Sequence, residues 1–122
     1  MKKIFNSHQY HGEKVNNAFF EGWYYKHVSQ EHGFNFALIP GISKSKDDPH
    51  AFIQLFITPM MIIKYFRFDV SEFHVDNETF AVTIGKNTFS LHHIDVDLQD
   101  EALHFSAKLN YSGLTPIQKS LF

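Results

Sequence analysis

The residues best suited to chemistry lie in one aromatic segment, residues 19–28, which reads FFEGWYYKHV. Glu21 is the only acid of this segment, and burial among aromatic rings would raise the pKa of its carboxyl group and suit it to general acid catalysis. The alternative is an ion pair with Lys26, Lys64 or Arg67, in which the carboxylate would serve only the fold. We take Glu21 as the candidate catalytic residue.

The aromatic residues of the same segment are candidates for contact with a ligand. Trp23, Tyr24 and Tyr25 offer flat apolar surfaces, and their rings could stabilise a cation through their π faces. The hydroxyl groups of Tyr24, Tyr25 and Tyr65 could also donate to a quinol or carbonyl oxygen, although buried tyrosines commonly donate to the backbone instead. Trp23, Tyr24 and Tyr25 are therefore predicted to bind a ligand.

Two cations interrupt the apolar run of residues 61–69. Lys64 and Arg67 could hold an anionic or polar ligand group at the mouth of a cavity, and we include them among the predicted ligand-binding residues. The alternative is that their heads extend to solvent from the edge of a strand.

Nine histidines raise the question of a metal site. His92 and His93 are adjacent, and neighbouring residues of a strand point to opposite faces, so the two do not ordinarily share one ion. The chain has no HExxH motif, no GxSxG motif and no glycine-rich phosphate loop. We therefore predict no metal, no cofactor and neither hydrolase nor nucleotide chemistry.

Length and composition bound the remaining possibilities. The 122 residues suit one compact domain, and the share of hydrophobic residues, 43%, is enough for a real core. A net charge of −2 gives no basic surface for nucleic acid. There are no cysteines, no export signal and no apolar run long enough for a transmembrane segment, so a cytoplasmic protein is expected.

The hydrophobic pattern predicts an all-β domain over residues 19–122, preceded by a polar N-terminal arm, residues 1–18. The first strands are expected at 22–29, 34–39, 51–58 and 61–69. After them, residues 79–109 alternate cleanly between apolar and polar, as an antiparallel meander with one solvated face does. Residues 70–75 fit a short strand or one helical turn. The expected fold is a lipocalin- or calycin-like antiparallel sheet or partial barrel of about eight strands.

The early strands are apolar on both faces. Ile53, Leu55 and Ile57 share one face, while Phe52 and Phe56 lie on the other. Such a sheet could enclose a cavity for an apolar ligand, or it could pack against a second domain or a further subunit. The apolar chain end favours the second explanation, and we expect a missing C-terminal domain or a homo-oligomer partner.

The segment Phe20–Lys26 resembles the N-terminal signature of the tocopherol cyclase-like family: phenylalanine, glutamate, glycine, tryptophan, tyrosine, an aromatic residue and a basic residue. Segments at Tyr10–Gly12, Phe36–Gly41, Phe52–Gln54 and Phe66–Phe68 are compatible with this resemblance. Members of the family are about two to three times as long as this chain and are similar to two-barrel, lipocalin-like proteins. The resemblance thus covers the N-terminal half of such a protein.

The resemblance implies action on, or binding of, an apolar prenyl or quinol-type molecule. In the plant enzymes, a phenol oxygen adds to a prenyl double bond by proton-assisted ring closure without a redox cofactor. Carried over, Glu21 would protonate the alkene, and Trp23, Tyr24 and Tyr25 would stabilise the cation. Two alternatives remain: a lipid-binding carrier without chemistry, and a β-sheet interaction domain without a ligand.

Overall fold

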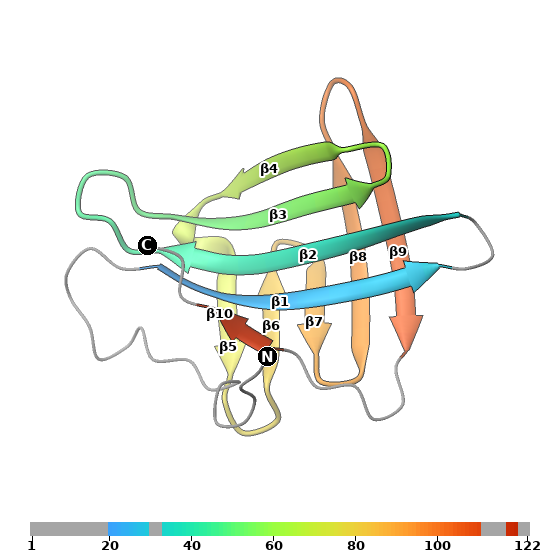
Figure 1. Cartoon of the computed structure of the whole chain (residues 1–122). Coiled ribbons are helices and arrows are strands. Elements are labelled where there is room, and N and C mark those ends of the chain that lie inside the picture. Colours follow the sequence, from blue (N-terminus) through green and yellow to red (C-terminus); the bar gives the residue numbers. More distant parts are fainter. Residues whose placement is uncertain (1–19, 30–32, 111–116, 120–122) are drawn as a thin grey trace.

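The chain folds into two antiparallel β-sheets (Figure 1). The computed structural model describes residues 20–29, 33–110 and 117–119. The first sheet has the spatial order β10-β1-β2-β3-β4 and the second the order β5-β6-β7-β8-β9. The strands of the first sheet are β1 (Phe20–Ser29), β2 (Phe34–Ser43), β3 (His50–Thr58), β4 (Ile62–Phe68) and β10 (Ile117–Lys119). Those of the second are β5 (Phe73–Asp76), β6 (Ala81–Ile84), β7 (Asn87–Ser90), β8 (His93–Gln99) and β9 (His104–Asn110).

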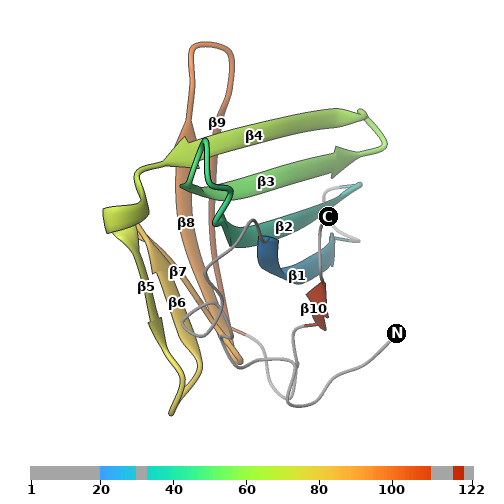
Figure 2. The same cartoon turned by 90° about the vertical axis from the view of Figure 1, so that its left-hand side faces the viewer.

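The strands of one sheet run across those of the other, and the chain passes between the sheets at one corner (Figures 1 and 2). This corner is the 3₁₀ turn η3 (Val70–Glu72) between β4 and β5. Asp69 caps it: its carboxylate accepts from the Ser71 backbone N–H, while the Glu72 carboxylate accepts from the Asp69 backbone N–H. The region 70–75 thus holds both of the structures that its sequence allows, a turn followed by a strand.

The core lies between the sheets and is built largely from aromatic rings. We call the face of the first sheet that packs on the second sheet its inner face. Trp23 of β1 lies against Phe73 and Phe80, with ring centroids 6.5 and 5.7 Å away, and Tyr25 meets Phe89 at 5.4 Å. All of these residues except the half-buried Phe73 are almost fully buried. Burial of so much aromatic surface is the main force that holds the sheets together.

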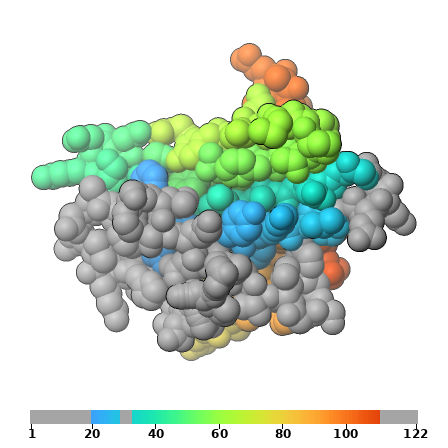
Figure 3. Space-filling model, viewed as in Figure 1, coloured from blue at the N-terminus to red at the C-terminus, as the bar shows by residue number. Residues whose placement is uncertain are grey.

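The opposite, outer face of the first sheet is also apolar. Phe52 is 1% exposed there, beside Phe20 and stacked on Tyr65 with centroids 5.3 Å apart. Ile39 is buried on the same face. The prediction that the early strands bury both faces is therefore confirmed only in part, because Val28 and Ile63 on the outer face are more than half exposed. Figure 3 looks onto this side of the molecule, where β3 and β4 reach the surface.

A glycine pair makes room for Phe52. Gly22 of β1 stands opposite Gly41 of β2 in the sheet register. A Cβ atom added to Gly41 would come within 2.5 Å of the Glu21 backbone oxygen and 2.6 Å of the Phe52 ring. This crowding gives a physical reason for the glycine of the Pro-Gly segment, Gly41.

The all-β antiparallel prediction is confirmed, and the strands form two packed sheets without closing into a barrel within the described residues. Strand bounds differ from the predicted ones mainly in β2, which continues to Ser43 through Pro40 and Gly41. Among the described residues, no helix is long and apolar enough to cross a membrane. The predicted arm, residues 1–18, lies outside the described part of the chain.

Replacing Gly41 with alanine tests the crowding at the glycine pair. We expect Gly41→Ala to lower the free energy of unfolding by about 2–3 kcal/mol, because backbone as well as a ring must move. The measurement is chemical denaturation followed by circular dichroism. Gly33→Ala is the control: Gly33 has φ of 74° but no atom near the added Cβ, so only the backbone strain, about 1 kcal/mol, should appear. Equal losses in the two variants would contradict the crowding.

Candidate functional site

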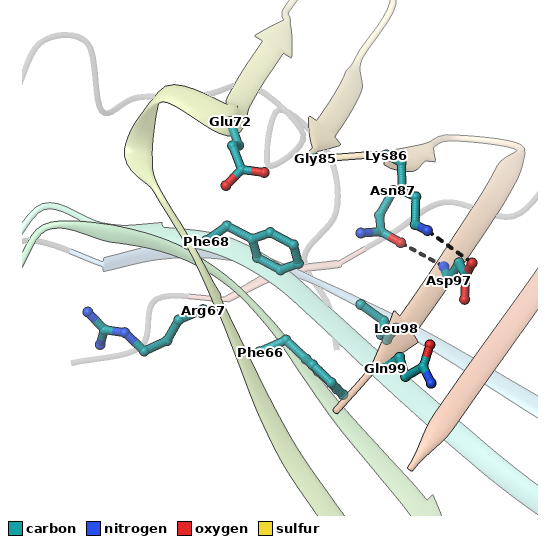
Figure 4. A pocket seen from close by; sticks show the side chains of 10 residues that line it. All are labelled: Phe66, Arg67, Phe68, Glu72, Gly85, Lys86, Asn87, Asp97, Leu98 and Gln99. Atoms are coloured by element: carbon teal, nitrogen blue, oxygen red, sulfur yellow. Dashed lines mark hydrogen bonds and ion pairs between the residues drawn. The ribbon is translucent and has the colours of Figure 1, made fainter. Parts of the chain in front are cut away.

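A cleft of about 580 Å³ opens between the edge strand β4 and the second sheet (Figure 4). It lies where the corner turn η3, the β6–β7 turn and strand β8 come together. The residues that line it are Phe66, Arg67, Phe68, Glu72, Gly85, Lys86, Asn87, Asp97, Leu98 and Gln99.

The apolar floor of the cleft comes from β4. Phe66 and Phe68 are two residues apart on one strand, so both rings lie on the inner face, and both are half-buried. Gly85 in the β6–β7 turn approaches Phe68 closely: a Cβ atom at Gly85 would lie 3.4 Å from its ring. Gly85 also has φ of 61°, which favours glycine. The backbone thus borders an accessible aromatic surface.

Asn87 holds the opposite wall. It is 1% exposed, its Nδ2 donates to the Ile84 backbone oxygen at 3.1 Å, and its Oδ1 accepts from the Asp97 backbone N–H at 2.7 Å. One side chain therefore ties the β6–β7 turn to β8. Because both of its partners are backbone groups, the wall is fixed by the fold itself.

The rim of the cleft is polar. Lys86, Glu72 and Asp97 line it, and Arg67 borders it, but the Arg67 guanidinium group is turned toward Asp48. The Asp97 carboxylate binds His104 Nε2 at 2.7 Å and Lys86 Nζ at 3.1 Å. These contacts, that with His104 first, hold the pKa of Asp97 below its usual value. A site of this kind favours a neutral polar group over a highly charged one.

Arg67 borders the cleft but points away from it in Figure 4. Its guanidinium group makes two hydrogen bonds to the Asp48 carboxylate, at 2.7 and 3.1 Å. This bidentate contact is the main reason that the pKa of Asp48 is lowered. Arg67 therefore joins β4 to the β2–β3 loop, and its remaining donors face the surface.

Lys64 lies on the inner face of β4, in line with Phe66 and Phe68, at the exposed edge of the sheet. Its ammonium group contacts the Asp100 carboxylate at 3.1 Å. Asp100 is at the tip of the β8–β9 hairpin, which projects past β4 in both ribbon views (Figures 1 and 2). Lys64 is therefore a link between the two sheets.

Three of the predicted site residues lie in the core. Glu21, Trp23 and Tyr25 are at most 2% exposed on the inner face of β1. The register places Glu21 in one row with Phe68, three strands away, which corresponds to roughly 14 Å. Glu21 therefore does not reach the cleft. Two of its candidate partners, Lys64 and Arg67, pair with aspartates instead.

Tyr24 lies on the outer face, apart from the other predicted residues. It lines a shallow groove of about 360 Å³ together with Lys26, Ile39 and Phe56. The structure thus places the predicted site residues in several places: the core, the outer groove, the interface between sheets and the edge of the cleft.

Sequence reasoning did not single out the polar residues of the cleft, namely Glu72, Lys86, Asn87 and Asp97. Each lies at a turn or on a strand whose alternation of apolar and polar residues gives no sign of a site. Only the crossing of the two sheets brings these residues together. Among the described residues, no group of three or more histidine, aspartate or glutamate side chains could hold a metal ion.

Removal of the Asn87 side chain tests how the wall of the cleft is held. We expect Asn87→Ala to reduce the free energy of unfolding by about 1–3 kcal/mol, because it strips partners from two backbone groups. Asn110→Ala, at an exposed asparagine whose Oδ1 lies 3.0 Å from His93 Nδ1, should change it by less than about 0.5 kcal/mol. Urea denaturation gives both values, and similar losses would show that Asn87 does not hold the wall.

Comparison with models of known protein families, with curated proteins and with solved structures found no match to this chain.

Proposed function

We propose that this chain binds an apolar prenyl or quinol-type molecule in the cleft between its two sheets. The observation that carries the proposal is the pairing of an aromatic floor, Phe66 and Phe68, with a polar rim in which Lys86 already pairs with Asp97. An amphipathic ring compound has the same two parts. Its ring or prenyl chain would lie on the phenylalanines, and its hydroxyl groups would meet the rim.

The size of the cleft supports this occupant. A volume of about 580 Å³ lies within the range of roughly 300–1,000 Å³ that small-molecule sites have. Among β proteins, the mouths of barrels such as lipocalins are common sites for one small ligand. We also propose that the fold is lipocalin-like. The resemblance of residues 20–26 to the tocopherol cyclase-like signature supports both the fold and the ligand class.

Ring closure is the narrower form of the proposal. In that reaction an acid gives a proton to the prenyl double bond, the phenol oxygen bonds to the carbon left electron-poor, and the phenol proton passes to a base. Glu21 is the proposed acid, and Trp23 and Tyr25 share its face of β1. Because Glu21 lies far from Phe68 across the sheet, ring closure requires the ligand to enter deeper than the cleft.

Binding is tested with a short-chain prenylated hydroquinone and equilibrium dialysis. We expect saturable binding that weakens about tenfold in Phe66→Ala, because roughly half of a phenylalanine's burial energy is lost. Ile63→Ala is the matched control: Ile63 is on the same strand, points to the outer face and is 57% exposed. Thermal unfolding confirms that both variants fold. Absence of saturable binding, or equal affinities in the two variants, would refute the cleft as the site.

Ring closure is tested with the same hydroquinone. The product is an isomer of the substrate, so chromatography followed by NMR identifies the new ring. We expect product with the unmodified chain and at least a hundredfold less with Glu21→Gln, which removes the acid and keeps the shape. Saturable binding without product would eliminate the cyclase form and leave a carrier.

A further inference from the structure

A tyrosine–histidine pair lies on the outer face of the first sheet, away from the predicted site. His50 begins β3, and Tyr65 lies on the neighbouring strand β4. His50 Nε2 and the Tyr65 hydroxyl oxygen are 2.7 Å apart, and His50 Nδ1 is 2.8 Å from the Asp48 backbone oxygen. His50 is 8% exposed, whereas Tyr65 is 43% exposed. A nearly buried imidazole therefore supports an accessible phenol group.

These contacts fix which atoms carry protons. A backbone carbonyl can only accept, so the Asp48 oxygen requires a hydrogen on His50 Nδ1. In the neutral imidazole, Nε2 is then the acceptor, and the Tyr65 hydroxyl donates to it. Burial is the main cause of a raised pKa at Tyr65, with Arg67 opposing it, so the phenol keeps its proton when no ligand is bound. The pair thus aligns a hydroxyl donor with a ring nitrogen that can accept its proton.

The surroundings of the pair keep it in place and supply charge. The Phe52 ring stacks on the Tyr65 ring at 5.3 Å, with the planes 16° apart. Arg67, two residues along β4, is held by the bidentate contact with Asp48. Beside the pair, His50 and Arg67 line a shallow hollow of about 320 Å³; Tyr65, which is 43% exposed, lies outside this lining. The acidic groups that line the same hollow are Asp69 and Glu72, and the capping contacts of η3 engage both.

We propose that Tyr65 and His50 form a proton-transfer pair for a ligand with an acidic hydroxyl group, that is, a phenol or an enol. The ligand O–H bond breaks and its proton passes to the Tyr65 oxygen, while the Tyr65 proton passes to His50 Nε2. The ligand is left as an oxyanion beside Arg67. The imidazolium formed still donates from Nδ1 to the Asp48 carbonyl.

This site is distinct from the cleft and does not require the cleft to be occupied. The cleft and the outer hollow share three lining residues, Arg67, Phe68 and Glu72. The aromatic floor of the cleft faces inward from β4, whereas Tyr65 and Arg67 face outward from the same strand. A hydroxyl group bound at the outer site therefore meets a base without contact with Phe66.

The experiment uses the complete chain and 4-nitrophenol, whose ionised form absorbs visible light. At a pH about one unit below the pKa of the free probe, we expect binding to lower the probe's pKa by about one unit, a tenfold rise in the ratio of ionised to neutral probe. Tyr65→Phe keeps the ring on Phe52 and removes only the oxygen, and it should abolish this rise, as should His50→Gln. His74→Gln, at an exposed histidine of β5, should behave as the unmodified chain does.

Two results would overturn the proposal: failure of the unmodified chain to bind or ionise the probe, and ionisation that persists in Tyr65→Phe. A third check needs no ligand. Nitrogen NMR of His50 should show the hydrogen on Nδ1, and a hydrogen on Nε2 in the neutral ring would refute the pair. The cleft is tested separately, by the effect of Phe66→Ala on binding of the prenylated hydroquinone. The proposal for the cleft and the proposal for the Tyr65–His50 pair can therefore fail independently.

Discussion

The packing of aromatic rings between crossed sheets is the constraint on which the rest of this structure depends. Trp23 of β1 packs against Phe73 and Phe80 on the side of the second sheet, and Tyr25 of β1 packs against Phe89. These rings fill the space between the two crossed sheets. The cleft lies at the border of this packing, where the half-buried Phe66 and Phe68 of β4 face the β6–β7 turn and β8.

The same constraint explains why the most conspicuous sequence segment is not the floor of the cleft. Alternation along β1 sends Trp23 and Tyr25 into the core and Tyr24 to the opposite face. Gly41, which has no side chain, then gives Phe52 the space to cover that face. A segment dense in aromatic residues can therefore serve two layers of packing at once.

Much of the fold could be predicted from local pattern, because strand alternation is a local property. The run before Pro59 and the alternation after Thr79 were enough to predict the early strands and the meander. The turn at Val70–Glu72 left a signal in the acid pair Asp69 and Glu72, three residues apart, which is the spacing of a capping box.

The candidate site could be predicted only in part, because it depends on contacts between distant segments. Arg67, predicted to lie at a cavity mouth, borders the cleft, but its guanidinium group turns away from it to Asp48. Nothing local shows that Asn87 ties a turn to β8, or that His50 meets Tyr65 fifteen residues later. Those contacts follow from sheet register and crossing, which one sequence does not specify on its own.

The position of Lys64 has a consequence for how this chain avoids self-association. Within the described residues, β4 pairs with β3 on one side only, and such an edge can recruit a strand from another molecule. A lysine on the inward face of an edge strand opposes this, because an added strand would remove its ammonium group from water. The contact with Asp100 holds the Lys64 ammonium group at the edge of the first sheet, where an added strand would have to cover it. The ion pair between the sheets thus also places a charge beside the unpaired edge of β4, a position that disfavours edge-to-edge pairing.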